Sequence, residues 1–320
     1  MIKWGVMGPG RIAHNFAKGI AVTDGAVIQA VASRNEKRAT QFAGQYQIET
    51  IYSDYQALTQ DPEVDIIYIA TPHAFHYEQA LMCLNAGKAV MCEKALTMTA
   101  EQSRYLHQVS KEQGVFIMEA FWSKFLPAWE QIQHWKLKIG DIKLVQSNFC
   151  FKAERNYSDR LFDPIQGGGA LHDIGIYNIA LSNYVFDQLP IQWQVLGTVG
   201  ETGVEESVSA VLEYEGDSRA TFTCSFNVTT PNTMTIFGEH GRIEIAEPFF
   251  GAEKATLVTD SANEVFEIPH AGAGFEYQIA EANACLQLGK IESGKHPMQA
   301  TIDTLEIIGE MRRSLGIGRQ

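Results

Sequence analysis

The sequence predicts two domains: an α/β domain with a doubly wound parallel sheet, then an α+β domain with a large, mainly antiparallel, open-faced sheet. A chain of 320 residues usually folds as two domains. Up to about residue 120, short β-branched apolar runs alternate with helical segments, as in repeated βαβ units. After residue 121, apolar and polar residues alternate over longer stretches, as in antiparallel strands. We therefore expect domains at residues 1–121 and 122–320.

The first domain is expected to contain five strands joined by helices. The strands are the apolar runs 2–7, 27–33, 65–70, 89–92 and 115–119. Helices are expected at 75–86 and 100–113, where apolar residues recur at helical spacing.

The second domain is expected to form a largely antiparallel sheet with strands at residues 143–152, 207–214, 219–228, 233–237, 242–246 and 255–259. Helices at 170–184 and 277–290 should cover one face of this sheet. The other face is left open or pairs with a second subunit, so we expect a homodimer. Arg312 and Arg313, with Gly316 just beyond, are typical of the end of a last helix at 300–315.

Composition excludes several classes of protein. Hydrophobic residues make up 45% of the chain and charged residues 20%, as in globular proteins. A net charge of -13 repels nucleic acid. Because we find no apolar run long enough to span a bilayer and no secretory segment, we expect a cytoplasmic location. The five cysteines form no CxxC pair and are interpreted as free thiols.

A glycine-rich motif follows the first expected strand and opens a helix. It reads Gly8-Pro9-Gly10-Arg11-Ile12-Ala13, which matches G-x-G-x-x-G/A. Gly8 permits a tight turn, Gly10 lets the backbone approach a pyrophosphate, and the small Ala13 lets the helix pack on the strand. The helix N-terminus attracts the anion. The motif therefore predicts a Rossmann-type dinucleotide site that includes Arg11 and Ile12.

The end of the second expected strand favours NADP over NAD. NAD sites usually carry an acidic residue there, but this chain has Ala32-Ser33-Arg34. The hydroxyl of Ser33 and the guanidinium of Arg34 suit a 2'-phosphate. The alternative is that Arg34 is only a solvated residue before the next helix.

Several spaced motifs together resemble the glucose-fructose oxidoreductase/inositol dehydrogenase-like family, most closely its dihydrodiol dehydrogenase branch. The motifs occupy residues 8–13, 70–76, 92–95, 118–122 and 167–177, with a further likeness over 237–245. The resemblance thus covers nearly the whole chain and implies an oxidoreductase acting on the CH–OH group of a small diol or sugar.

The resemblance implies that Glu93-Lys94 corresponds to the family's E-K-P motif, whose lysine lies beside the nicotinamide and the reacting oxygen. Ala95 replaces the proline, which removes a restraint on the backbone of this loop. From the residues alone, Lys94 follows the strand expected at 89–92, at the sheet edge where such folds bind ligands. The alternative is a surface lysine.

The resemblance also places Thr71, Pro72 and His73 along the cofactor and His76 close to it. His73 and His76 alone are weak evidence for a metal, because a third ligand is not evident, and we expect no metal site.

A glycine run at 167–169 precedes Asp173 and Tyr177, which are four residues apart on an expected helix and so project from one face. In the resemblance, Tyr177 takes the position where many family members carry histidine. Trp122 and Phe151 match aromatic positions that line the substrate pocket, although both would also suit ordinary core packing.

The expected mechanism pairs Lys94 with Tyr177. An ammonium neighbour stabilises phenolate, so Tyr177 would exchange the substrate proton while Lys94 polarises the oxygen. Which of the two transfers the proton stays open, as does the direction of the reaction. Asp173 is expected to orient substrate hydroxyls or Lys94. Alternatives are a sugar or inositol dehydrogenase of the same family and a non-catalytic regulator that senses NADP.

Overall fold

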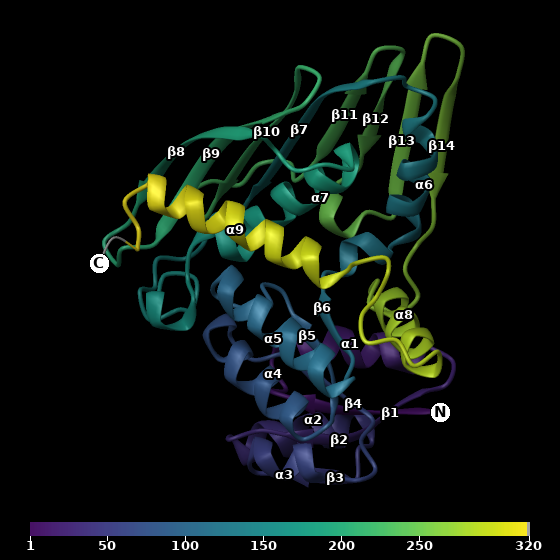
Figure 1. Cartoon of the computed structure of the whole chain (residues 1–320), viewed down its shortest axis with the longest axis vertical. Coiled ribbons are helices and arrows are strands. Elements are labelled where there is room, and N and C mark those ends of the chain that lie inside the picture. The colour runs from purple at the N-terminus through teal and green to yellow at the C-terminus, as the bar shows by residue number, and fades with distance from the viewer. Residues whose placement is uncertain (319–320) are drawn as a thin grey trace. The chain divides into compact units, whose positions relative to one another are not determined.

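Two units make up the computed structural model, which describes residues 1–318 (Figure 1). Residues 1–125 and 270–302 form the first unit, and residues 126–269 with those from 303 onward form the second. The expected boundary at residue 121 lies close to the first change of unit. The functional roles expected of the two domains stay predictions.

The first unit is built on a six-stranded sheet in the order β3-β2-β1-β4-β5-β6. Every pairing in it is parallel, as predicted for a Rossmann-type domain. The strands are β1 (Ile2–Met7), β2 (Ala26–Ala32), β3 (Thr50–Tyr52), β4 (Ile66–Ile69), β5 (Ala89–Glu93) and β6 (Ile117–Ala120). All five expected strands are confirmed, and β3 is an addition at the sheet edge.

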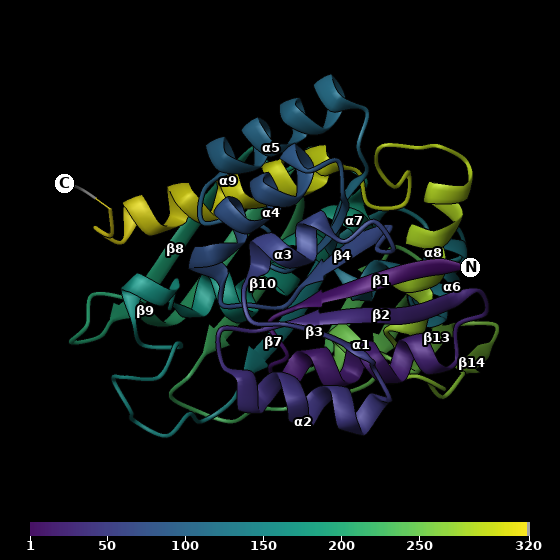
Figure 2. The same cartoon turned by 90° about the horizontal axis from the view of Figure 1, so that it is seen from below.

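Helices cover both faces of this sheet. Figure 2 shows α1 (Arg11–Ala21) and α2 (Glu36–Tyr46) on one side, and α3 (Tyr55–Gln60), α4 (His76–Asn85) and α5 (Ala100–Gln113) on the other. The buried residues accordingly form two clusters. Trp4, Phe16 and Phe42 belong to the first, and Leu58, Leu84 and Leu106 to the second. Such burial stabilises a domain by roughly 1.5–3 kcal/mol for each large side chain.

Helix α8 (Glu276–Gln287) belongs to the first unit, which corrects the expectation that residues 277–290 cover the antiparallel sheet. Its Ile279, Ala282 and Cys285 pack in the same cluster as Trp4 and Phe16. A Cβ on Gly19 of α1 would lie 2.8 Å from the Ile279 side chain, so the two helices approach closely. Segment 270–302 therefore departs from the expected domain 122–320.

The second unit is built on an eight-stranded sheet in the order β14-β13-β12-β11-β7-β10-β9-β8. All its neighbours are antiparallel except β7 and β10. The strands are β7 (Ile142–Cys150), β8 (Gln192–Val199), β9 (Glu205–Tyr214), β10 (Ser218–Ser225), β11 (Met234–Gly238), β12 (Gly241–Ile245), β13 (Lys254–Thr259) and β14 (Asn263–Glu267). The six expected strands are confirmed, and the two edge strands β8 and β14 are additions.

One face of this sheet carries α6 (Pro127–Lys136) and α7 (Ile176–Phe186) (Figure 1). Ser147 of β7 faces α7, where its Oγ accepts a hydrogen bond from Asn178 Nδ2 at 2.8 Å. The neighbouring Gln146 and Asn148 therefore project from the other face, because side chains alternate along a strand. There they line an open depression of about 470 Å³ over β7 to β10.

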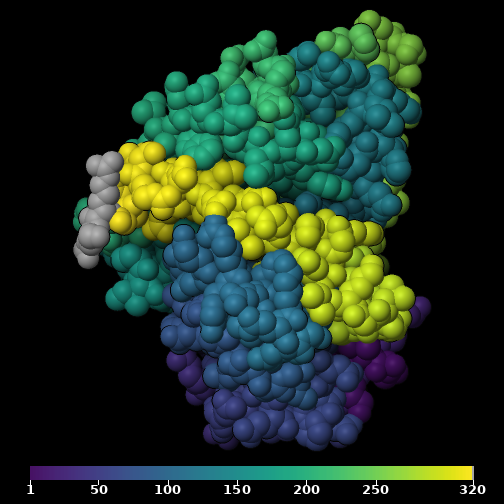
Figure 3. All heavy atoms as spheres, viewed as in Figure 1, coloured from purple at the N-terminus to yellow at the C-terminus, as the bar shows by residue number. Residues whose placement is uncertain are grey.

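The last helix, α9 (Met298–Ser314), begins in the first unit and continues in the second. Gln299, Glu306 and Glu310 are exposed residues of this helix. The helix itself is visible in yellow in Figure 3. Their spacing of seven and four residues is that of one helical face.

Candidate active site

The glycine motif forms a tight turn between β1 and α1. Gly8 has φ +86°, and a Cβ there would lie only 2.6 Å from Thr71 Cγ2, so no other residue fits. Gly10 is the N-cap of α1 and has no side chain to cover the first N–H groups of the helix. Ala13 is fully buried against the sheet. This arrangement fits a pyrophosphate at the N-terminus of α1, next to Arg11 and Ile12.

The residues after β2 form a second polar turn. Ser33 is buried, and its Oγ accepts the N–H of Asn35 at 3.0 Å, while Asn35 Oδ1 caps α2 by accepting the N–H of Arg38. Arg34 is exposed, and its guanidinium carbon lies 5.4 Å from the centre of the Phe75 ring. An exposed arginine held against an aromatic face and next to a helix N-terminus suits a phosphate group.

His76 connects the loops that follow β4 and β5. Its Nε2 lies 2.7 Å from the carbonyl oxygen of Thr71, and its Nδ1 lies 2.8 Å from the carbonyl oxygen of Ala95. Burial lowers the pKa of His76, against the opposing pull of the two carbonyls. The imidazole ring thus joins the two loops through both of its nitrogens.

The loop after β4 contains the other residues expected along the cofactor. Thr71 Oγ1 donates to Gln79 Oε1 at 2.5 Å, and Pro72 precedes a short 3₁₀ helix that begins at His73. The rings of His73 and His76 lie 5.7 Å apart. Within residues 1–318, no group of three or more His, Cys, Asp or Glu residues is arranged to hold a metal ion.

Glu93 and Lys94 mark the carboxyl end of β5. Glu93 is buried, and its Oε1 accepts the hydroxyl hydrogen of Tyr68 at 2.6 Å. Lys94 is half-buried, and the peptide bond between Lys94 and Ala95 is cis. Since β1, β4 and β5 are adjacent, the glycine turn, the loop at 70–76 and Lys94 all lie at one edge of the sheet.

Burial raises the pKa of Glu93 to about 7, against the hydrogen bond from Tyr68 and the charge of Lys94. Between the ordinary carboxyl value and pH 7, the unfolded chain loses this proton while the folded protein keeps it, so stability falls as pH rises. We therefore expect Glu93→Gln to stabilise the unloaded protein at pH 8 by roughly 1–3 kcal/mol. Urea unfolding at pH 4.5 and pH 8 measures this, and an equal effect at both pH values would contradict the prediction.

Trp122 begins a 3₁₀ helix (Trp122–Phe125) just after β6. Its ring centre lies 5.3 Å from that of Phe275 and 6.4 Å from that of His270. A Cβ on Gly274 would lie 2.6 Å from the Trp122 ring, so the 270–275 loop packs directly against this tryptophan.

In the second unit, Asp173 lies on a π-helical turn (Leu171–Gly175) that leads into α7, and Tyr177 is in the first turn of α7. Both residues are buried. Asp173 Oδ1 accepts a hydrogen bond from Arg160 Nη1 at 2.8 Å. A Cβ on Gly168 would lie 2.7–2.9 Å from backbone oxygens of residues 160–163, so this glycine lets the loop bearing Arg160 approach. Arg160 could not be predicted as a partner of Asp173, because an isolated arginine in a polar loop usually lies in solvent.

Helix α9 also anchors this segment. Arg312 was expected only to end the helix, but its Nη1 lies 2.7 Å from His172 Nδ1, and its Nε lies 3.3 Å from Glu205 Oε2. Glu205 Oε1 accepts the N–H of Leu171 at 3.1 Å. Burial raises the pKa of Glu205, against the attraction of Arg312. These contacts anchor Leu171 and His172, the first two residues of the π-helical turn.

An aromatic cluster surrounds Tyr177. Its ring centre lies 5.8 Å from that of Phe149 and 5.2 Å from that of Phe250, and these two phenylalanines stack at 4.1 Å. Phe151 lies 6.5 Å from Phe149 and 5.4 Å from Phe226. Phe151 and Tyr177 thus belong to one aromatic cluster in the second unit. Asp173 belongs to the same unit and lies four residues before Tyr177 in the chain. Lys94 and Trp122 belong to the first unit.

Comparisons with known proteins match both parts of the chain. Residues 2–121 match an oxidoreductase family with a NAD-binding Rossmann fold, and residues 136–244 match the GFO/IDH/MocA C-terminal domain. The chain is also 34% identical over 329 residues to the trans-1,2-dihydrobenzene-1,2-diol dehydrogenase of Mus musculus, covering 99% of this chain and 97% of that protein. The chain belongs to the GFO/IDH/MocA oxidoreductase family.

The Homo sapiens protein of the same name is 32% identical over 329 residues, with 99% of this chain and 97% of that protein covered. Solved structures with a similar fold include a levoglucosan dehydrogenase with NADH and levoglucosan (TM-score 0.88, 18% identity, covering 98% and 97% of the two chains). A 3-ketoreductase variant from Actinomadura kijaniata with NADP and TDP-benzene has a TM-score of 0.84 at 24% identity and the same coverage.

Membership of the GFO/IDH/MocA family confirms the predicted resemblance and the predicted class of enzyme. The chain is an oxidoreductase whose first unit is an NAD(P)-binding Rossmann domain. None of the helices within residues 1–318 is long and apolar enough to cross a membrane.

Proposed function

We propose that this member of the family is an NADP-dependent enzyme that transfers hydride between nicotinamide and a secondary alcohol or carbonyl of a small diol or sugar. The main support is the position of Lys94 directly after β5, at the sheet edge that also carries the glycine turn after β1. A trans-dihydrodiol is the first substrate class to test, because the curated relatives named above are dihydrodiol dehydrogenases. An aldose is the second.

Residues of the first unit would hold the cofactor. The N–H groups at the start of α1 suit the pyrophosphate, and Ser33 and Arg34 suit a 2'-phosphate. Thr71, Pro72, His73, His76 and Glu93 belong to the loops and strand ends at the same edge. The fold neighbours contain NADH in one case and NADP in another, so the preference for NADP rests on the residues of this chain.

Bound nicotinamide would donate or accept the hydride at its C4 carbon. In our proposal Lys94 polarises the substrate oxygen, and Tyr177 accepts its proton during oxidation and returns it during reduction. Asp173, held by Arg160, orients substrate hydroxyls, and Trp122 and Phe151 provide apolar walls.

Purified protein with NADP+ or NADPH should be screened against trans-dihydrodiols, aldoses, inositols and dicarbonyls, with NADPH absorbance as the signal. We expect turnover of a dihydrodiol. Turnover of inositols or aldoses alone would identify the enzyme as a sugar or inositol dehydrogenase. Binding of NADPH with no turnover across the panel would contradict the catalytic proposal and favour a regulator that senses the cofactor.

We also propose a homodimer formed through the open face of the second sheet. On that face Leu196 and Val211 are 79% and 39% exposed, next to the polar residues that line the depression over β7 to β10. Large exposed apolar side chains on a sheet face favour contact with another protein surface. Sedimentation should give twice the 35.6 kDa mass of one chain, and a monomer at micromolar concentration would contradict the proposal.

The proposed location is the cytoplasm. All five cysteines are buried free thiols, which is the state that a reducing compartment maintains. We propose no nucleic-acid partner and no metal cofactor.

A further inference from the structure

The loop that follows Lys94 is held at three successive residues. The carbonyl oxygen of Ala95 lies 2.8 Å from His76 Nδ1, and the N–H of Leu96 donates to Glu119 Oε1 at 2.9 Å. Thr97 Oγ1 donates to the carbonyl of Thr99 and lies 2.7 Å from Ser103 Oγ. Such close restraint is unusual for a loop, and it starts immediately after the proposed catalytic lysine.

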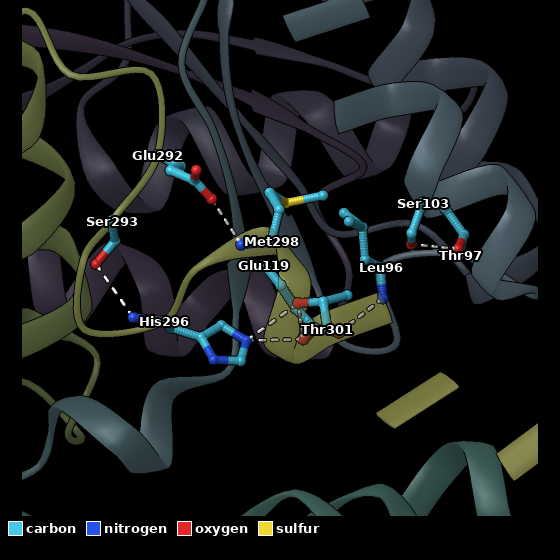
Figure 4. A network of polar contacts seen from close by, with 9 residues as sticks. All are labelled: Leu96, Thr97, Ser103, Glu119, Glu292, Ser293, His296, Met298 and Thr301. Atoms are coloured by element: carbon cyan, nitrogen blue, oxygen red, sulfur yellow. Dashed lines mark hydrogen bonds and ion pairs between the residues drawn. The ribbon is translucent and has the colours of Figure 1, made fainter. Parts of the chain in front are cut away.

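Glu119 is the charged member of these contacts and comes from the neighbouring strand. It lies in β6, where it pairs with Cys92 of β5, two residues before Lys94. Its side chain is only 2% exposed. Its Oε2 lies 2.9 Å from His296 Nε2 and accepts the hydroxyl hydrogen of Thr301 at 2.8 Å. Figure 4 shows these groups and Leu96 converging on the carboxylate.

The surroundings of Glu119 favour its ionised form. Burial alone would raise its pKa, but the hydrogen bonds from His296, Thr301 and Leu96 outweigh burial, and the pKa of Glu119 lies below its ordinary value. Burial lowers the pKa of His296, against the hydrogen bond to Glu119, and the ring places Nε2 next to the carboxylate as a donor. The His296 ring also stacks on Phe121 at 5.4 Å, which fixes its orientation.

We propose that Glu119 is a positioning residue for Lys94: it fixes the backbone of the lysine loop through the N–H of Leu96, while His296 and Thr301 hold its carboxylate in place. This inference rests on the proposed catalytic role of Lys94. A lysine side chain has several rotatable bonds, so its ammonium is placed accurately only if its backbone is fixed. Misplacement by about 1 Å can cost about 100-fold in rate.

The simplest alternative is that Glu119 only joins segment 293–301 to β6 and so stabilises the fold. Ser293 Oγ accepts the N–H of His296 at 3.4 Å, and Glu292 Oε2 accepts the N–H of Met298 at 2.8 Å, so this segment has other anchors (Figure 4). Under this alternative, substitution of Glu119 would lower stability without acting through Lys94.

The test uses two substitutions of Glu119 that differ in one property. Glu119→Gln keeps an oxygen that accepts the Leu96 N–H, whereas Glu119→Leu removes every acceptor at similar size. We expect kcat to fall by about 10-fold or more in Glu119→Leu and by less than about 3-fold in Glu119→Gln. NADPH affinity, measured by fluorescence, should change by less than about 3-fold in both, since Glu119 is not assigned to the cofactor.

A double-mutant cycle separates positioning from stability. In a Lys94→Met background, adding Glu119→Leu should leave the residual kcat unchanged, because there is no lysine left to position. Amide hydrogen exchange of Leu96 in the unloaded protein should be faster in Glu119→Leu. Ser110→Ala is the matched control: it removes a buried hydrogen bond to Val115 at the far end of α5 and should change neither kcat nor exchange at Leu96.

The outcomes distinguish this inference from the proposed function. Near-normal turnover in Lys94→Met would contradict the catalytic role of the lysine. Two results would overturn the positioning role alone, each together with loss of turnover in Lys94→Met. One is a normal kcat in Glu119→Leu, and the other is an equal loss from Glu119→Leu in the unsubstituted protein and in the Lys94→Met background.

If Glu119→Leu does not fold, Thr301→Val removes one donor to the carboxylate at nearly constant volume. Faster exchange at Leu96 and lower kcat in that variant support the inference, and no change in either overturns it.

Discussion

Replacing Lys94 with methionine is expected to lower kcat by about 10³-fold, while NADPH still binds. Methionine keeps the length and the apolar stem of the side chain, but it has no positive charge and no hydrogen that it could donate to the substrate oxygen. It therefore removes stabilisation of the charge that develops on the substrate oxygen, and such interactions contribute to the transition state more than to binding. Stopped-flow turnover with a dihydrodiol and fluorescence titration with NADPH measure the two quantities.

Tyr177→Phe tests the second member of the pair by removing only the hydroxyl from the aromatic cluster. Its stability should change little, because the ring contacts with Phe149 and Phe250 remain. If Lys94 and Tyr177 act as a unit, the kcat of the double variant Lys94→Met/Tyr177→Phe should be little lower than that of either single variant. Near-normal turnover in one single variant would remove that residue from the mechanism.

Both sheets were predictable because each type of strand has its own pattern. Strands such as β4, fully buried on both faces, are short apolar runs, and β7 and β9 alternate in burial. The pattern is weak at edges: β8 is largely exposed along its length and contains Gly197, and β3 has only three residues. Such strands lack the buried residues from which periodicity is detected.

The placement of α8 could not be predicted, because an apolar helical face does not specify which partner it packs against. Residues 276–287 carry a buried face that suits either unit, and only the tertiary structure places Ile279 against Gly19. The packing of the adjacent 270–275 loop on Trp122 could not be predicted either, because about 150 residues of sequence separate the two.

Local motifs of the candidate site were predictable from the sequence, and its long-range contacts were not. The glycine turn needs only neighbours in the chain, and its geometry follows from Gly8 and Gly10. In contrast, Glu119 depends on His296, 177 residues away, and Arg312 on His172, 140 residues away. Partners at such separations leave no trace in the spacing of a single sequence.

Replacing Arg34 with aspartate is expected to weaken NADPH binding by about 100-fold, or about 2.7 kcal/mol, with little effect on NADH. The change removes the charged donor proposed for the 2'-phosphate and adds a negative charge that repels it, whereas NADH has only a hydroxyl there. Arg34 is exposed and caps no helix, so the fold should be retained. Fluorescence titrations with both cofactors give the ratio of affinities directly.

Salt dependence provides an independent check on Arg34, because an exposed ion pair is screened by ions. In the unsubstituted protein, the affinity for NADPH should fall as the salt concentration rises, and the affinity for NADH should fall less. The Arg34→Asp substitution should remove most of this difference between the two cofactors. Arg104→Asp is the control, since it makes the same change of charge on α5, where Arg104 is 45% exposed. If Arg34→Asp weakened both cofactors equally, the 2'-phosphate assignment would be wrong and Arg34 would act only through the net charge of the surface.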